Sequence, residues 1–423
     1  MLSFGGFLRQ LVAQLQTHQI IPCVLRNYEG FPETNIGNDV DFMIRPDQLP
    51  FAIQAVESIP GIRITGYNEQ YHVAMTFLDG VSAVPGRNAF QVDFIRSFTW
   101  KGLPYLVPED VIASAVQRNQ DGFKFFVPSP VCEALISLLT SLVISGFVKE
   151  RYFADVRREL ASHPAEAKAI LRPAFGQRVA ARLVEATIDG DKSKILLCIG
   201  PLRRALLIRR FLRKPLESLL AVIRHHAIVL RVRHSPQTLQ TIRIFCPNAR
   251  LGKQAADNLV AALRYIAPEV EYGAGLDISS SFSIARIACW LSAEWRRQFG
   301  GRKNLTLRVS SSELLYQCGN AKGLKPAMHR WAASLAVRFL PRTDLWILLK
   351  PHTQTDSLAI CGEWMRSKKN CIEVDASDPA SDVVANMRVA VVDALAQRTE
   401  VKLVSILKRA LLAKGIASRE SEL

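Results

Sequence analysis

The segment LRNYEGFPETNIGNDVDFMIRPDQL, residues 25–49, contains two aspartates one residue apart, Asp39 and Asp41, at the start of an apolar run. The apolar residues 42–44 follow directly, which is typical of a strand that enters a core and not of a solvated loop. Alternate residues of a strand point to the same face, so we expect the two carboxylates to lie side by side.

A second apolar segment, FQVDFIRSF (residues 90–98), carries Asp93. If its strand pairs with that of residues 38–44, three carboxylates converge, and repulsion would keep one of them protonated. A Mg²⁺ ion removes this conflict, because it binds carboxylate oxygens and substrate phosphates together. Asp39, Asp41 and Asp93 are therefore candidate catalytic residues and metal ligands, and Asp93 is also a candidate general base for an attacking hydroxyl. The alternative is structural: Asp39 caps a turn, and Asp41 pairs with an arginine.

Residues 22–155 resemble the nucleotidyltransferase-like proteins encoded among bacterial polysaccharide genes. Three stretches carry the resemblance: LRNYEGFPETNIGNDVDFMI, FQVDFIRSFTWKGLPYL and EALISLLTSLVISGFVKERY. The resemblance implies a small mixed sheet flanked by helices, a nucleoside triphosphate substrate, and Asp39, Asp41 and Asp93 as the three acids around the metal. The family's Gly-Ser turn is replaced here by residues 26–28, RNY. Arg26 is thus a candidate phosphate ligand, with a surface or ion-paired arginine as the alternative.

The segment IRIFCPNARLGKQAADNL, residues 242–259, places a damaged phosphate-binding loop between an expected strand and an expected helix. In a working loop, glycines let backbone N–H groups face the phosphates, a lysine reaches the outer phosphates and a hydroxyl binds Mg²⁺. Gly252 and Lys253 match this pattern and are candidate phosphate ligands. Pro247 replaces the first glycine and Gln254 replaces the hydroxyl residue. We favour a structural turn over a phosphate site here.

Residues 240–398 resemble thymidylate-kinase-like P-loop domains. The stretches RWAASLAVRFLPRTDLWILLK and CIEVDASDPASDVVANMRVAVVDALAQR carry this resemblance best. The family's Asp-Arg motif is replaced by Arg308 and Val309, its acidic residue after the next strand by Lys350, and residues 359–363 lack the arginines of its lid. Each loss removes a charge or metal contact that phosphoryl transfer uses. The resemblance therefore implies a kinase-like domain without kinase activity, a pseudokinase.

Residues 201–233 are strongly basic, with nine lysines or arginines against one glutamate among many aliphatic residues. Three interpretations remain open: a helix that packs its leucines between domains, a segment that lies on anionic lipid, and a segment that binds nucleic acid. The net charge of +16 agrees with any anionic partner. Nucleic acid is the least favoured, because no nucleic-acid-binding motif accompanies the basic residues.

The periodicity divides the chain into four parts: a nucleotidyltransferase-like domain over 1–190, a basic amphipathic linker over 191–238, a degenerate P-loop domain over 239–400, and a C-terminal helix or tail over 401–423. Both domains are expected to be α/β, the second with a parallel sheet because strands and helices alternate. The expected helices are 1–20, 45–59, 129–147, 252–267, 328–340 and 381–398, with helix continuing to about residue 190. The expected strands are 20–28, 38–44, 71–80, 90–98, 241–246, 305–309, 344–350 and 371–376.

The chain contains eight scattered cysteines without a C-x-x-C pair, which favours single thiols over a disulfide framework or a zinc site. No signal peptide is recognised, and the most apolar stretch, residues 134–148, is short for a bilayer span. We expect a cytoplasmic protein, peripheral to the inner face of the membrane if residues 201–233 bind lipid.

The leading functional interpretation is Mg²⁺-dependent nucleotidyl or related phosphoryl transfer in bacterial surface polysaccharide biosynthesis, with nucleotide and polysaccharide-biosynthesis proteins as partners. The second is a non-enzymatic scaffold or regulatory protein of an envelope-glycan system that binds nucleotide or membrane. A nucleotide kinase that acts through Lys253 is the third.

Overall fold

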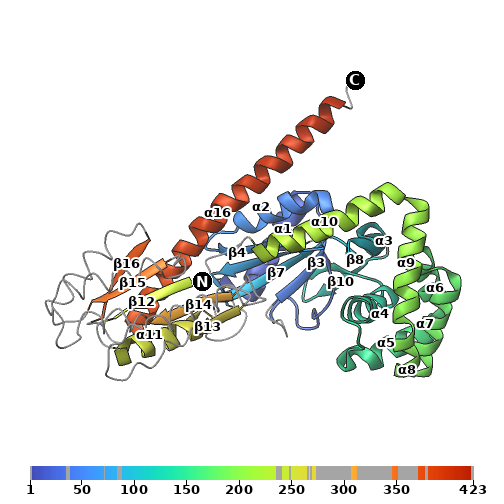
Figure 1. Cartoon of the computed structure of the whole chain (residues 1–423), viewed down its shortest axis with the longest axis horizontal. Coiled ribbons are helices and arrows are strands. Elements are labelled where there is room, and N and C mark those ends of the chain that lie inside the picture. Colours follow the sequence, from blue (N-terminus) through green and yellow to red (C-terminus); the bar gives the residue numbers. More distant parts are fainter. Residues whose placement is uncertain are drawn as a thin grey trace, which may run out of the picture.

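The structure is a computed structural model that describes residues 2–34, 39–70, 72–82, 88–234, 241–246, 249–263, 266, 269–272, 306–311, 345–350, 370–376 and 380–420. The described residues form a mixed α/β protein built around two sheets (Figure 1). One sheet is mixed and has seven strands, and the other is parallel and has five. This confirms the expected α/β class. It also confirms that one sheet is mixed and the other is parallel.

The seven-stranded sheet has the order β10-β11-β2-β3-β7-β5-β4, and its two central neighbours β3 and β7 run parallel. The chain thus crosses from β3 to β7 through a helix and the hairpin of β4 and β5. Its strands are β2 (Cys23–Val24), β3 (Asp39–Met43), β4 (Arg63–Glu69), β5 (Val73–Asp79), β7 (Ala89–Ile95), β10 (Val116–Gln120) and β11 (Phe123–Val127). Two short pairs flank it: β1 (Leu2–Ser3) with β6 (Val81–Ser82), and β8 (Phe98–Trp100) with β9 (Leu103–Leu106).

One face of this sheet is covered by helices α1 (Phe4–Thr17) and α2 (Leu49–Glu57), the latter preceded by a 3₁₀ turn at Pro46–Gln48. Ser3 caps α1, since its Oγ accepts a hydrogen bond from the N–H of Gly6. Val40 and Phe42 belong to the buried core that includes α1 and α2. Because side chains alternate along a strand, Asp39 and Asp41 project from the opposite face.

A helical end continues from the other side of the sheet, and its helices share one hydrophobic core. The expected helix over 129–147 is divided: α4 runs into a π-helical turn at Thr140–Ser145, which stops at Gly146 with φ +81°. The helices of this end are α3 (Pro108–Ala113), α4 (Pro130–Leu139), α5 (Glu150–Ser162), α6 (Pro164–Phe175), α7 (Gln177–Asp189), α8 (Lys192–Leu197) and α9 (Ile199–Arg213).

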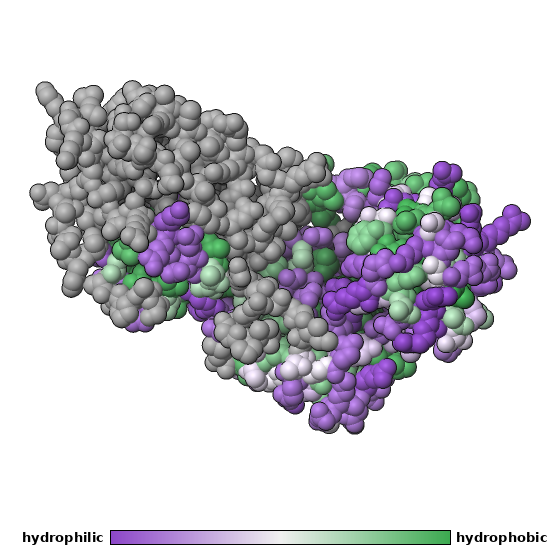
Figure 2. Space-filling view, turned by 90° about the horizontal axis from the view of Figure 1, so that it is seen from below, coloured by the Kyte–Doolittle hydropathy of each residue, from purple (hydrophilic) through white to green (hydrophobic). Residues whose placement is uncertain are grey.

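The basic segment is helical and is divided at a proline, since α9 ends at Arg213 and α10 (Pro215–His234) begins at Pro215. However, Ile195, Leu202 and Leu206 lie in the same buried core as α4 to α7, so α8 and α9 belong to the N-terminal body and do not form a free linker. Hydrophobic and hydrophilic groups both reach the surface of this helical end when it is seen from below (Figure 2). No described helix is both long and apolar enough to cross a bilayer.

The five-stranded sheet has the order β13-β14-β12-β15-β16, and all of its strand pairs are parallel. The expected strands of this half are found, whereas the expected helix over 328–340 lies outside the described residues. The elements are β12 (Thr241–Phe245), α11 (Ala249–Ala262), β13 (Glu269–Tyr272), β14 (Thr306–Ser311), β15 (Leu345–Lys350), β16 (Cys371–Asp375) and α16 (Ala380–Glu420).

The two sheets are joined by α16, which packs along the edge strand β4 (Figure 1). The Oγ1 of Thr399 donates to the carbonyl oxygen of Thr65, and the Oγ1 of Thr65 donates to that of Ile266. Leu403 is buried in the core of the seven-stranded sheet. The expected boundary at residue 400 thus falls inside an unbroken helix, because the residues on both sides of it pack against the first sheet.

Candidate active site

Three carboxylates lie together on the face of the seven-stranded sheet that α1 and α2 leave open. In the parallel pair of β3 and β7, Asp41 lies opposite Asp93 and Asp39 lies opposite Gln91. The carboxylate oxygens of Asp39, Asp41 and Asp93 lie within 4.8 Å of one another. The structure therefore brings together the three acids that the sequence singled out.

Burial and mutual repulsion perturb this acidic cluster. The pKa of Asp93 is raised to about 7, first by burial and then by the charge of Asp41, while a hydrogen bond from Gln91 Nε2 (2.7 Å) opposes the rise. The pKa of Asp41 is also raised, first by burial, with Asp39 adding to the rise and Arg26 opposing it. A cluster in this state favours a proton or a cation.

Arg26 supplies a cation from the chain itself. The N–H of Leu25 donates to the carbonyl oxygen of Asp41 (3.0 Å), which places the next residue beside the cluster. The Nε of Arg26 donates to Oδ2 of Asp41, and its guanidinium lies 3.8 Å from Oδ2 of Asp39. Although burial lowers the pKa of Arg26, the two aspartates raise it more. The arginine required by the structural interpretation of Asp41 is therefore Arg26.

The donor set fits a hard divalent cation. Carboxylate oxygens are the ligands that Mg²⁺ prefers, and three of them converge from two adjacent strands. Asp39 and Asp93 are only half-buried, so the cluster can be reached from solvent. Arg26 contributes one positive charge against three acids, so its neutralisation of the cluster is incomplete. A divalent ion would complete it.

A pocket of about 500 Å³ opens beside Arg26, between the chain after β2 and helices α4 and α5. The hydroxyl of Tyr28 donates to Oε2 of Glu133 across this pocket at 2.7 Å. The guanidinium of Arg151 stacks on the ring of Tyr152 at 4.9 Å and donates to Oδ1 of Asn27 at 3.3 Å. The pocket therefore offers aromatic rings and hydrogen-bonding groups next to the acidic cluster, with four arginines balanced by four carboxylates, Glu29, Glu133, Asp155 and Glu159.

The sequence analysis did not identify the pocket residues Tyr28, Glu133, Arg151 and Tyr152. They come from segments more than a hundred residues apart, and only the packing of α4 and α5 beside β2 brings them together. No spacing pattern in the sequence indicates that these residues meet. The only available signal was the resemblance, whose quoted stretches include all four.

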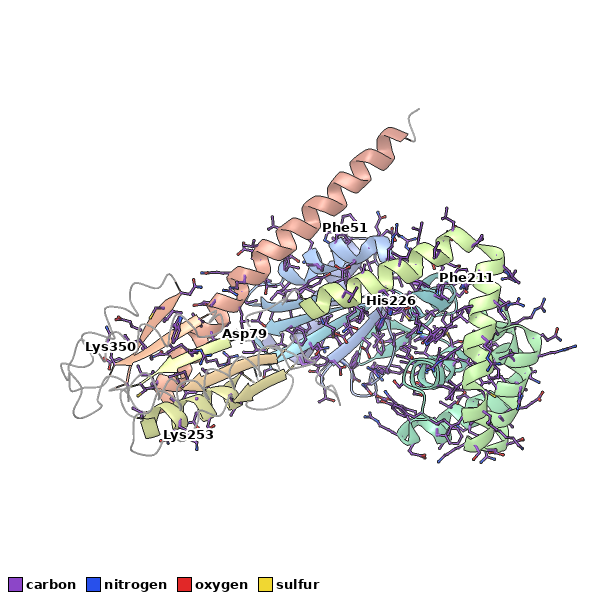
Figure 3. The ribbon with its side chains drawn as sticks, viewed as in Figure 1. Phe51, Asp79, Phe211, His226, Lys253 and Lys350 are labelled. Carbon is purple, nitrogen blue, oxygen red and sulfur yellow. The ribbon has the colours of Figure 1, made fainter. Side chains whose placement is uncertain are left out.

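Gly252 and Lys253 lie elsewhere, on α11 beside the five-stranded sheet (Figure 3). Helix α11 begins at Ala249, so Lys253 is its fifth residue and falls beyond the four unpaired N–H groups of the helix start. Gly252 is buried and Lys253 is exposed. Lys350, at the end of β15, forms an ion pair with Glu373 of β16. Pro247 and residues 359–363 lie outside the described residues.

No protein-family model matches the chain, and no curated protein matches it. The geometry of the acidic cluster and its pocket therefore carries the functional assignment.

Proposed function

We propose that the N-terminal half is a metal-dependent nucleotidyltransferase, or an enzyme of related phosphoryl transfer, acting in bacterial surface polysaccharide biosynthesis. The convergence of Asp39, Asp41 and Asp93 within 4.8 Å is the observation that carries this proposal. The pocket beside Arg26 supports it, because aromatic rings and arginines suit a base and its phosphates. The polysaccharide pathway and a cytoplasmic location rest on the sequence resemblance.

In this proposal the three aspartates hold a Mg²⁺ ion that neutralises charge on the transferring phosphoryl group. Asp93 lies close enough to the other two acids to take the proton of a hydroxyl that attacks at the metal. Arg26, which pairs with Asp41 in this structure, would be free to bind the phosphates if the carboxylates held a metal instead. Tyr28 and Arg151 bind and orient the rest of the nucleotide in the pocket.

The C-terminal half is, in the same proposal, a degenerate P-loop domain that docks or regulates. In the parallel sheet, β13 and β14 lie on one side of β12, and β15 and β16 lie on the other. In sheets of this order, α/β proteins bind ligands at the carboxyl ends of the strands. Two features argue against phosphoryl transfer there. Lys253 lies within α11, and Lys350 pairs with Glu373 in place of holding a metal.

Calorimetric titration of each nucleoside triphosphate with Mg²⁺ tests the proposal. We expect binding by the wild type that disappears without Mg²⁺ and weakens at least tenfold in the Asp39→Asn/Asp41→Asn variant. The Lys253→Ala variant is the matched control and should bind as the wild type does. Binding that survives loss of both aspartates but not of Lys253 would move the nucleotide site to the C-terminal half.

A second candidate function is a non-enzymatic scaffold, and the ion pair of Arg26 with Asp41 favours it. An arginine that permanently occupies the acidic cluster would replace the metal and leave a structural charge network. The same titration separates the two candidates, since a scaffold of this kind needs no divalent ion. Absence of Mg²⁺-dependent nucleotide binding in the wild type would favour the scaffold.

A further inference from the structure

The corner between α9 and α10 presents aliphatic side chains to solvent. Leu212 and Leu216, which flank the corner, are 80% and 68% exposed. Further along α10, Leu219, Ile223 and Leu230 are each about half exposed. Phe211 and His226 mark the two helices in Figure 3. We define the outer stripe as the exposed aliphatic residues Leu212, Leu216, Leu219, Leu220, Ile223 and Leu230.

The stripe on α10 is continuous because its residues recur at helical spacing, with intervals of three, four and seven. The opposite face of α10 packs against the β8–β9 hairpin. There Ser218 is 4% exposed, and the backbone of Ala221 approaches Gly102 so closely that a Cβ on Gly102 would lie 2.4 Å from its carbonyl oxygen. One side of α10 is therefore held against the hairpin, while the opposite side exposes aliphatic side chains. A helix whose outer face meets only water does not need such side chains there.

The arginine side chains that the structure describes in this segment divide into two groups. Arg203, Arg209 and Arg210 point inward and donate to backbone carbonyl oxygens of the N-terminal body. Arg204, Arg213 and Arg224, in contrast, are exposed. Arg213 and Arg224 each follow a residue of the outer stripe in the sequence, and Arg204 lies eight residues before Leu212 on α9. The only acid between residues 201 and 233, Glu217, is held by Lys214 at 2.9 Å. The exposed face thus combines aliphatic side chains with uncompensated positive charge.

We propose that this face of α9 and α10 docks on an anionic lipid bilayer. Lipid chains can cover the outer stripe while anionic headgroups neutralise the arginines around it. Charge decides against a second copy of the chain, because pairing α10 with α10 would bring like charges together. Nucleic acid would neutralise the arginines but leave the leucines exposed to water. This inference does not depend on the proposed nucleotidyl transfer.

Flotation of the full-length protein with vesicles tests the docking. We expect the wild type to float with vesicles of phosphatidylcholine containing about a third phosphatidylglycerol, and to remain unbound with phosphatidylcholine alone. The Leu216→Ser/Leu219→Ser/Ile223→Ser variant should lose at least tenfold in partition onto anionic vesicles. Arg204→Gln/Arg213→Gln/Arg224→Gln should lose a similar factor and also most of the salt dependence.

Val401→Ser and Arg178→Gln are matched controls, since each changes an exposed residue of the same kind away from the stripe. Both should float as the wild type does, and unchanged thermal unfolding should show that every variant is folded. A wild type that does not float with anionic vesicles would overturn the proposal. A dimer in sedimentation that dissociates in the leucine variant, with no vesicle binding, would overturn it in favour of self-association.

Discussion

At the scale of residues, the central feature is a cluster of four charged groups. A strand whose side chains alternate between the two faces of the sheet places Asp39 and Asp41 together, and parallel pairing brings in Asp93. This part of the site follows from the alternation of side chains along a strand, so it was predictable from the sequence. The position of Arg26 was not, because the residues between strands follow no period. The sequence left open whether Arg26 binds phosphate, and the structure adds its ion pair with Asp41.

Replacement of Arg26 by glutamine tests the balance between arginine and metal. Asp41 is 3% exposed, so losing its hydrogen bond from Arg26 should lower the free energy of unfolding by about 1–3 kcal/mol without divalent ions. Mg²⁺ should then restore part of this loss, so the melting temperature should rise more on adding Mg²⁺ than in the wild type. Arg45→Gln, at an exposed ion pair, is the control. Equal responses to Mg²⁺ in Arg26→Gln and wild type would contradict the account.

His72 should make stability depend on pH. Burial lowers the pKa of His72 to about 4 from the usual 6.5, and the charges of Arg96 and His225 add to this effect. The unfolded chain therefore takes up this proton near pH 6.5 and the folded chain only near pH 4. The neutral histidine stabilises the fold fully above pH 6.5, and this contribution of at most about 3 kcal/mol is lost as the pH falls to 4.

The His72→Gln variant isolates this contribution from the other titrating groups. Between pH 7 and pH 4 its free energy of unfolding in urea should fall less steeply than that of the wild type. The two curves should run parallel above pH 7, where His72 is neutral in both states. Parallel curves over the whole range would show that His72 is not held neutral by its surroundings.

At the scale of elements, sequence patterns predicted many of the strands but missed the buried strands β4 and β11 as well as the exposed strand β10. β3, β7, β12, β15 and β16 were predicted because apolar residues dominate them. β10, with the sequence VQRNQ, is a mostly exposed edge strand, and its residues show no alternation that could identify it. The expected strand over 20–28 shortens to Cys23–Val24, since the chain leaves the sheet to place Arg26 and Tyr28 in the site.

Helix ends were the least predictable positions. The aliphatic run over 129–147 carries no breaker before Gly146, but the hydroxyls of Thr140 and Ser141 donate to backbone carbonyl oxygens of the preceding turn where the π-helical turn begins. Helix α16 continues past the expected end at residue 398, because the first sheet provides a surface for Thr399 and Leu403. Contacts between distant segments therefore account for the extension of α16.

Gly102 is a sensitive test of how α10 is anchored. Its φ of +85° favours glycine, and a Cβ there would meet the carbonyl oxygen of Ala221 at 2.4 Å. Gly102→Ala should therefore lower the free energy of unfolding by about 1–3 kcal/mol more than Gly122→Ala does. Gly122 has a similar φ of +80° but no atom within 4 Å of the added Cβ, which makes it the matched control. Equal losses in urea unfolding would mean that α10 does not rest on the hairpin.

At the scale of the whole molecule, the two sheets are joined by a polar seam along β4 and β5. Asp79 is buried and accepts hydrogen bonds from Arg63 of β4 and from Arg388 of α16 (Figure 3). Arg63 also pairs with Asp393 of α16. The sequence could not predict this contact, because its partners lie about 300 residues apart and each alone is an ordinary charged residue. The seam makes the C-terminal half a structural partner of the half that carries the acidic cluster.

Asp79→Ala should weaken the seam strongly. It leaves Arg388, which is largely buried, without its carboxylate, and we expect a loss of about 2–4 kcal/mol in the free energy of unfolding. Asp393→Ala removes an exposed partner of Arg63 and should cost less than about 1 kcal/mol. Urea unfolding of the two variants gives both values. A loss for Asp79→Ala no larger than that for Asp393→Ala would mean that the seam does not hold the two halves together.

The most direct test of the central claim is to count the Mn²⁺ ions bound at the acidic cluster. Electron paramagnetic resonance measures free Mn²⁺ during titration of the wild type and of the Asp39→Asn/Asp41→Asn variant, each with and without nucleoside triphosphate. The account predicts at least one ion bound by the wild type, tighter binding when nucleotide is present, and loss of that ion in the variant. The same Mn²⁺ binding in both proteins, or none in either, would contradict a metal site at Asp39, Asp41 and Asp93.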